Sequence, residues 1–282
     1  MEHRVLQPSD HHIRIEPPRG WQLVNVRELW RFRELVFFLI WRDVKVRYKQ
    51  ALLGVAWAVL QPAMLMLVFS VFLGRLGGFT GGSIPYPLFV LTGLVAWTFF
   101  ASAVGQAGGS VIGSERLITK IYFPRLAVPF AAVGAALFDF LISLGLLGVV
   151  MAWYSHPPSW QIVFLPFVFL ILLLTATGLG TLLAALTVAY RDFRYVTPFI
   201  IQVGMYATPS IYMALPEAPS EGLKLWLALN PLVAPIEAFR SCLLGGPMPW
   251  GGLAISAVVA VALFAGGCLY FRKIEDDFAD KI

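Results

Sequence analysis

Charged residues are scarce in this chain. Lys, Arg, Asp and Glu make up 13% of its 282 residues, whereas 59% are hydrophobic. A soluble domain carries about 25% charged residues, so this composition excludes a protein whose main solvent is water. Cysteine is nearly absent as well. Cys242 and Cys268 are the only two, which argues against a disulfide framework and against a thiolate metal site.

Sequence motifs for metal binding, phosphate binding and catalysis are also missing. The four histidines show no metal-ligand spacing. No G-x-x-x-x-G-K-[ST] phosphate loop occurs, since the glycine-rich stretch Gly77 to Ser83 lacks its lysine. No acids, bases or nucleophiles converge as a membrane enzyme would need. We therefore expect no catalytic residue, metal or cofactor on this chain, and no ATP binding by the chain alone.

Long apolar runs are present instead. A helix needs about 20 apolar residues to cross a hydrocarbon core about 30 Å thick. Six runs qualify, near residues 54-74, 86-108, 126-153, 160-189, 196-215 and 250-271, and Asp139 is the one formally charged side chain within them. The sequence thus predicts an all-α integral membrane protein with six transmembrane helices.

Lys and Arg are placed asymmetrically. Of the 21, 18 lie in segments 1-53, 109-125, 190-195 and 272-282. Because cytoplasmic loops carry the excess of basic residues, these segments and both termini are expected in the cytoplasm of a bacterial cell, with an even number of spans. The net charge of +5 then reflects topology, not nucleic acid binding. The first apolar run, Leu35 to Trp41, is too short for a cleavable signal.

The pattern divides the chain into four parts: a cytoplasmic lead-in (1-24), an amphipathic interfacial helix (25-52), a six-helix transmembrane domain (53-272) and a cytoplasmic tail (273-282). A solvated helix packed on the protein itself is the alternative for residues 25-52. Prolines interrupt the apolar pattern after Tyr206. Irregular backbone at membrane depth needs cover from protein, so we expect short re-entrant helices between spans five and six, at Leu225 to Phe239.

Polar residues mark candidate sites. Basic residues where the interfacial helix meets the first span suit anionic lipid headgroups or a pyrophosphate: Arg42, Lys45, Arg47 and Lys49. Asp139 fits either a proton relay or a buried acid hydrogen-bonded to a neighbouring helix. A polar line on span five and aromatic faces suited to sugar rings predict a substrate conduit: Trp57, Gln61, Trp97, Phe100, Gln202, Tyr206, Ser210 and Tyr212.

Several segments occur together in the order and spacing of one family. They include Arg27-Glu28-Leu29-Trp30, Gln61-Pro62, Ile118 to Arg125, Tyr190 to Tyr195, Thr208 to Tyr212, and Asn230-Pro231 with Glu237 to Arg240. Over residues 27-240 the chain resembles the permease subunit of type-2 ATP-binding-cassette polysaccharide exporters, which move O-antigen, capsule or teichoic acid polymers.

The resemblance implies a complex of two permeases and two separate ATPase subunits, with ATP and Mg on the ATPases. It implies export of an undecaprenyl-diphosphate-linked glycan across the inner membrane, with aromatic residues of spans one, two and five lining the conduit. Residues 25-50 and the loop from Gly113 to Arg125 would contact the ATPases, the loop as a short amphipathic helix. The residues expected there are Arg27, Glu28, Arg31, Glu34, Glu115, Leu117, Ile118, Lys120 and Ile121.

Other functions stay open at this point. Export of a drug or small lipid by the same machinery is the nearest alternative. A proton-coupled secondary transporter would depend on Asp139 alone. A membrane-embedded transferase would need a catalytic constellation that the sequence lacks.

Overall fold

The computed structural model describes residues 26–49, 54–78, 84–211, 227, 229–275 and 278, and their regular elements are helices. Five helical stretches are long and apolar enough to cross a membrane. They are α3 (Ala56–Phe69) continued by the π-helix η1 (Ser70–Leu76), α4 (Tyr86–Gly113), α6 (Ala127–Trp153), the 3-10 helix η2 (Trp160–Phe164) continued by α7 (Leu165–Ala189), and α11 (Trp250–Glu275). The all-α class and five of the predicted spans are confirmed.

The sixth predicted span, 196-215, corresponds to α8 (Phe193–Ala207), which has 15 residues. At 1.5 Å per residue it is about 22 Å long, short of a hydrocarbon core of about 30 Å. The helix ends because Thr208 turns to extended backbone, as residues before proline commonly do. Residues 212–226 lie outside the described part, and a sixth span is not confirmed.

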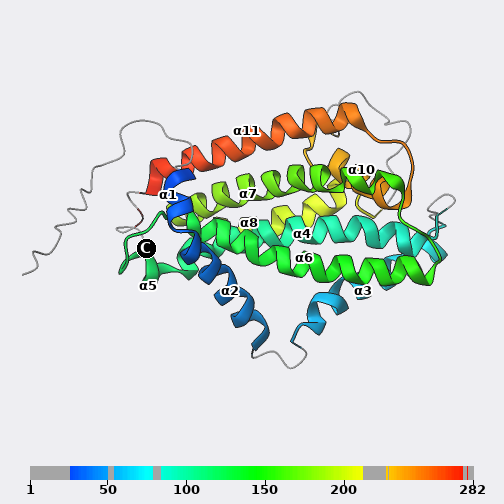
Figure 1. The fold of residues 1–282 in the computed structure, drawn as a ribbon, viewed down its shortest axis with the longest axis horizontal. Helices are drawn as coiled ribbons and strands as arrows, with labels where there is room; N and C mark the ends of the chain where they lie inside the picture. The colour runs from blue at the N-terminus through cyan, green and yellow to red at the C-terminus, as the bar shows by residue number, and fades with distance from the viewer. Residues whose placement is uncertain are drawn as a thin grey trace, which may run out of the picture.

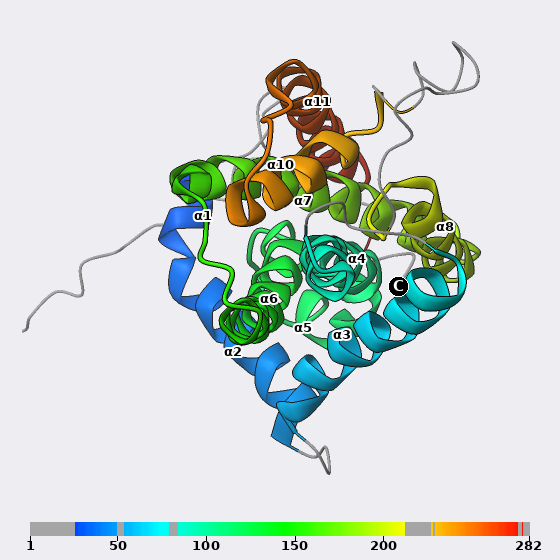
Figure 2. The same ribbon diagram turned by 90° about the vertical axis from the view of Figure 1, so that its right-hand side faces the viewer.

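The helix α4 lies at the centre of the bundle. In its most apolar window 78% of residues are buried, against 6–33% in the other four candidate spans. The helices α6 and α7 pack along it, and α3, α8 and α10 (Val233–Leu244) complete the ring around it (Figures 1 and 2). A shift of any of these helices would therefore change its packing against α4.

Small residues bring two further helices together. A Cβ atom added to Gly267 of α11 would lie 2.3 Å from the carbonyl oxygen of Gly178 in α7. Close backbone approach is the usual basis of helix association in lipid, where the hydrophobic effect between helices is lost. Gly109 and Gly113, by contrast, have nothing within 4 Å of such an atom.

Two helices precede the bundle, α1 (Val26–Arg31) and α2 (Arg33–Lys49). The helix α2 packs across α6, burying Leu39 and Val44 and placing Ile40 against Gly134. Its outer face exposes Phe37, Phe38 and Trp41. A helical segment is found where the interfacial helix was predicted, while its contact with lipid and the division into four parts stay predictions.

The bundle has two different ends, which we call the α5 end and the α10 end. At the α5 end, α1, α5 (Glu115–Ile118) and the last turn of α11 lie together (Figure 1). There an apolar cluster, the α5-end cluster, buries Ile118, Phe123, Phe271 and Phe278. The α10 end carries α10, which packs on α4, α7, α11 and η2. Of the predicted re-entrant pair, residues 225, 226 and 228 fall outside the described residues and α10 covers the second half, while re-entrance itself is not confirmed.

Candidate functional site

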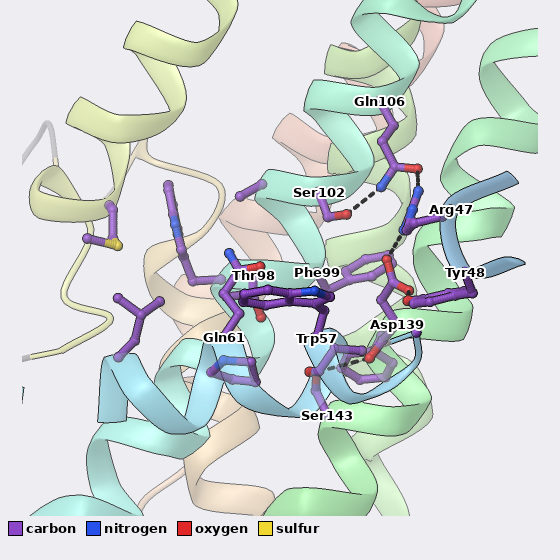
Figure 3. Close-up of a pocket in the computed structure, with 18 residues that line it drawn as sticks. Arg47, Tyr48, Trp57, Gln61, Thr98, Phe99, Ser102, Gln106, Asp139 and Ser143 are labelled. Atoms are coloured by element: carbon purple, nitrogen blue, oxygen red, sulfur yellow. Dashed lines mark hydrogen bonds and ion pairs between the residues drawn. The ribbon is translucent and has the colours of Figure 1, made fainter. Parts of the chain in front are cut away.

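A cavity of about 640 Å³ lies between α3, α4 and α6, with Met205 of α8 at its edge. Three predicted conduit residues line it: Trp57, Gln61 and Trp97 (Figure 3). The Trp57 side chain is 53% exposed, whereas Trp97 is buried. Aromatic faces and hydrogen-bonding groups thus share one cavity, which suits a ligand that carries both CH-rich faces and hydroxyl groups.

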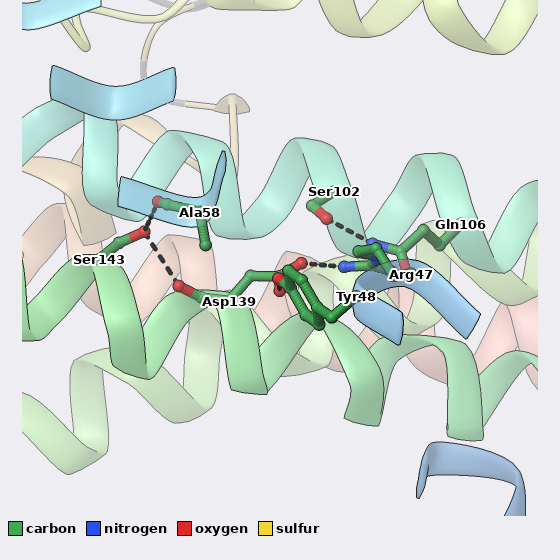
Figure 4. Close-up of polar contacts among 7 residues, drawn as sticks. All are labelled: Arg47, Tyr48, Ala58, Ser102, Gln106, Asp139 and Ser143. Carbon is green, nitrogen blue, oxygen red and sulfur yellow. Dashed lines mark hydrogen bonds and ion pairs between the residues drawn. The ribbon is translucent and has the colours of Figure 1, made fainter. Parts of the chain in front are cut away.

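One side of this cavity is strongly polar because α2 extends two side chains to Asp139 of α6. Arg47 forms an ion pair with Asp139 and also donates to the Gln106 side-chain oxygen, and the Tyr48 hydroxyl donates to Asp139 (Figure 4). Gln106 Nε2 in turn donates to Ser102 Oγ at 2.5 Å. Asp139 is therefore not a lone charge, and of the two alternatives the structure favours an acid held by a neighbouring helix.

The phenol of Tyr48 keeps its proton in this network. Burial, together with the hydrogen bond to Asp139 and its negative charge, raises the pKa of Tyr48 to about 12. At physiological pH the hydroxyl is protonated and donates to the carboxylate, as Arg47 does. Together they compensate the charge of Asp139, which would otherwise cost several kcal/mol within a span.

The basic residues predicted to dock a headgroup or pyrophosphate differ in their surroundings. Arg42 pairs with Asp43 at 2.8 Å and reaches Ser114 Oγ at 3.5 Å. Lys45 lies over the Trp41 ring, 5.2 Å from its centroid. Lys45 and Lys49 are exposed, while the charge of Arg47 is compensated by Asp139. Two exposed ammonium groups therefore remain for an external anion.

The other predicted conduit residues that the structure describes do not line the cavity. Phe100 is 4% exposed and packs in the core, its ring 5.5 Å from that of Trp97. Gln202 and Tyr206 lie on the exposed face of α8, and Ser210 is fully buried in the turn that follows. Tyr212 lies outside the described residues. The structure thus brings together Trp57, Gln61 and Trp97, and leaves Phe100 of α4 and the conduit residues of α8 apart.

The residues predicted to contact an ATPase lie at the α5 end. Arg31, Glu34, Glu115, Lys120 and Ile121 are exposed, and Leu117 is partly buried. The side chains of Arg27 and Glu28 are outside the described part. Helix α5 itself has four residues, fewer than the 113-125 segment suggested, and residues 119–126 between it and α6 form turns and bends.

Ile118 differs from its predicted neighbours, because it is 6% exposed and belongs to the α5-end cluster. The exposed apolar residues of the loop are instead Ile121, at 56%, and Tyr122, at 74%. Tyr122 lies inside the predicted segment but was not among the residues predicted to contact the ATPase. Its large aromatic side chain next to Ile121 is the feature of the sequence that could have indicated it.

Several residues of the cavity were missed from sequence. Tyr48, Ser102 and Gln106 join the polar network, and Phe99 and Phe140 line the cavity. A lone acid in an apolar span requires a partner, but ten Lys and Arg residues precede the first span and nothing in the sequence singles out Arg47.

Comparison with known proteins gives concordant matches. The ABC-2 type transporter family matches residues 34–244. The O-antigen export system permease protein RfbA of Myxococcus xanthus is 31% identical over 264 residues, covering 91% of this chain and 98% of that protein. A protein of the same name from Klebsiella pneumoniae is 27% identical over 252 residues, covering 88% and 94%. The polysialic acid transport protein KpsM of Escherichia coli is 24% identical over 243 residues, covering 84% and 92%.

Proposed function

Because this chain belongs to the ABC-2 type transporter family, we propose that it is the permease of an ATP-driven exporter that moves a lipid-linked polysaccharide across the bacterial inner membrane. The observation that carries the proposal is the match along nearly the whole chain to permeases named for O-antigen export. Relatives named for polysialic acid and capsule export extend the substrate class to polysaccharides in general.

The cavity supports this substrate class. Sugar rings present CH-rich faces to aromatic side chains such as Trp57 and Trp97, while their hydroxyl groups suit amide and hydroxyl partners such as Gln61. Anionic groups of a lipid carrier, of the undecaprenyl-diphosphate type, would meet the exposed ammonium groups of Lys45 and Lys49, beside Arg42. A drug or small lipid would require fewer hydrogen-bonding groups than this cavity offers.

The energy source is proposed to be a separate ATPase. No phosphate loop occurs in the sequence, so two nucleotide-binding subunits would bind ATP and Mg for a pair of permeases. A two-fold axis between two copies is the simplest way to enclose a polymer conduit. The α5 end is assigned to the cytoplasm because the basic residues concentrate there, and Ile121 with Tyr122 offers an apolar contact for the ATPase.

A proton-coupled mechanism finds less support. Its candidate group, Asp139, already forms an ion pair with Arg47 and accepts from Tyr48. A relay carboxylate needs to exchange its proton with a pathway, whereas this one is occupied by two donors from α2.

The decisive experiment removes the chain from cells that make a polysaccharide and follows where the lipid-linked glycan accumulates. We expect glycan on the cytoplasmic side, with export restored by this chain together with an intact ATPase but not with an ATPase that cannot hydrolyse ATP. Unchanged export without the chain, or restored export that follows the proton gradient and ignores the ATPase, would overturn the proposal.

A further inference from the structure

Arg240 of α10 is a buried cation that forms no ion pair among the described residues, although the charge of Glu237 on the same helix acts on it. Its side chain is 9% exposed. Nη1 donates to the Pro209 carbonyl oxygen at 3.0 Å, and Nη2 donates to that of Ser210. The guanidinium also lies over the Phe89 ring of α4, 4.0 Å from its centroid. Carbonyl dipoles and an aromatic face thus hold a charge that would be costly to bury alone.

The turn that accepts hydrogen bonds from Arg240, residues 208–211, also forms hydrogen bonds with side chains of other elements. The Tyr86 hydroxyl of α4 donates to the Ile211 carbonyl oxygen at 3.0 Å. Asn230 Nδ2, just before α10, donates to Thr208 Oγ1 at 3.1 Å. Gly93 of α4 makes room for this contact, since a Cβ atom there would lie 1.9 Å from the Ser210 carbonyl oxygen. We call this group of contacts the α8 anchor.

The rest of α8 is held far less firmly. Outward-facing residues along it are exposed, including Phe199 at 65% and Val203 at 48%. Pro198 lies inside the helix, where it removes one backbone hydrogen bond. The beginning of α8 lies beside the loop that contains α5, as shown by a pocket of about 290 Å³ that Arg191, Arg194 and Glu115 line together. One end of α8 is thus fixed, and the other reaches the surface proposed for the ATPase.

We propose that Arg240 is a positioning residue for transport, which fixes the α10 end of α8 so that motion at the α5 end pivots the helix about this anchor. The inference rests on the proposed function for its transport step. Because Met205 of α8 borders the main cavity, pivoting changes the cavity that receives the glycan. Arg240 is not among the described residues that line the cavity, so it would act through α8.

The test uses the permease assembled with its ATPase in lipid vesicles loaded with lipid-linked glycan. Arg240→Met keeps apolar volume but removes every donor. Arg240→Met loses two hydrogen bonds from a charged group, and one such loss already corresponds to a factor of about ten, so we expect glycan exported per ATP hydrolysed to fall by at least about tenfold. Arg240→Lys, which keeps the charge and some donors, should recover part of the ratio. All values are expressed per assembled complex, so a mere loss of folded protein does not register.

Two glycine variants on α4 form a matched pair. Gly93→Ala would place a Cβ atom 1.9 Å from the Ser210 carbonyl oxygen and 2.3 Å from Arg240 Nη2, so it should separate the turn from the guanidinium without changing residue 240, and so lower the same ratio. Gly109→Ala, where nothing lies within 4 Å, should leave it unchanged. If Arg240→Met does not assemble, Gly93→Ala and Arg240→Lys still decide the question.

A thiol readout tests the anchor without transport. Ser210 is fully buried, so Ser210→Cys should resist an aqueous thiol reagent in the otherwise unchanged chain and become reactive when Arg240→Met is added. A reactive thiol with an unchanged export-to-ATP ratio would overturn the positioning role, as would a thiol that stays protected. If the parental vesicles export no glycan, the proposed function fails, and the thiol result still reports on the anchor.

Discussion

Asp139→Asn removes one charge from the network beside the cavity and keeps the shape of the side chain. Arg47 then keeps Gln106 but loses its counter-charge. Removing one partner of a fully buried pair costs about 3–5 kcal/mol. The Arg47 and Asp139 side chains are 31% and 21% exposed. Solvent screening therefore reduces the expected loss in the free energy of unfolding to about 1–2 kcal/mol.

The double variant Arg47→Met with Asp139→Leu removes both charges and should be more stable than either single variant, since no uncompensated charge remains. Thermal unfolding of the purified parental permease, of Arg47→Met, of Asp139→Leu and of their double variant gives the coupling energy of the pair. A coupling below about 0.5 kcal/mol, the scatter of independent sites, would refute this account of Asp139. If Asp139 were instead a proton relay, Asp139→Asn would abolish export without changing stability, and the double variant would not recover export.

Three further predictions concern the ATPase contact, the cavity and the topology. Ile121→Asp should release the ATPase or uncouple it from export without loss of stability, whereas Ile118→Asp should destabilise the fold; co-purification with the ATPase and thermal unfolding separate the two, and full coupling in Ile121→Asp would contradict the contact. Trp57→Ala should lower glycan export with little change in stability, while Phe100→Ala should cost about 3–5 kcal/mol of unfolding free energy; equal stability losses would contradict the assigned positions. Arg116→Cys should be labelled by an impermeant thiol reagent only from the cytoplasmic side, and labelling from outside would reverse the topology.

The spans could be predicted from sequence because crossing lipid requires a long apolar run, which composition alone reveals. The residues of α8 pass the same test of composition, but the structure ends that helix at Ala207, before Pro209. The local sequence pattern extended the predicted span through this turn. In the structure, the Pro209 and Ile211 carbonyl oxygens of the turn accept hydrogen bonds from the side chains of Arg240 and Tyr86.

The site could be predicted only in part. Trp57 and Gln61 lie four residues apart on one helix, and Trp97 is on the next span, so the residue types were informative. The partner of Asp139 could not be predicted from residue types, because Arg47 is 92 residues away in sequence and only the packing of α2 on α6 brings the two together. Ile118 was assigned to a partner for a similar reason, since an amphipathic pattern does not tell which apolar residue the chain's own core takes.

The buried position of Phe278 has a consequence for the order in which parts of the protein reach their final packing. This side chain follows α11 in sequence, yet it belongs to the α5-end cluster together with Ile118, which is made 160 residues earlier. The spans can enter the membrane one after another during synthesis, but this cluster cannot close until Phe278 has been made. The loop proposed for the ATPase therefore reaches its final packing only after all five candidate spans have been synthesised.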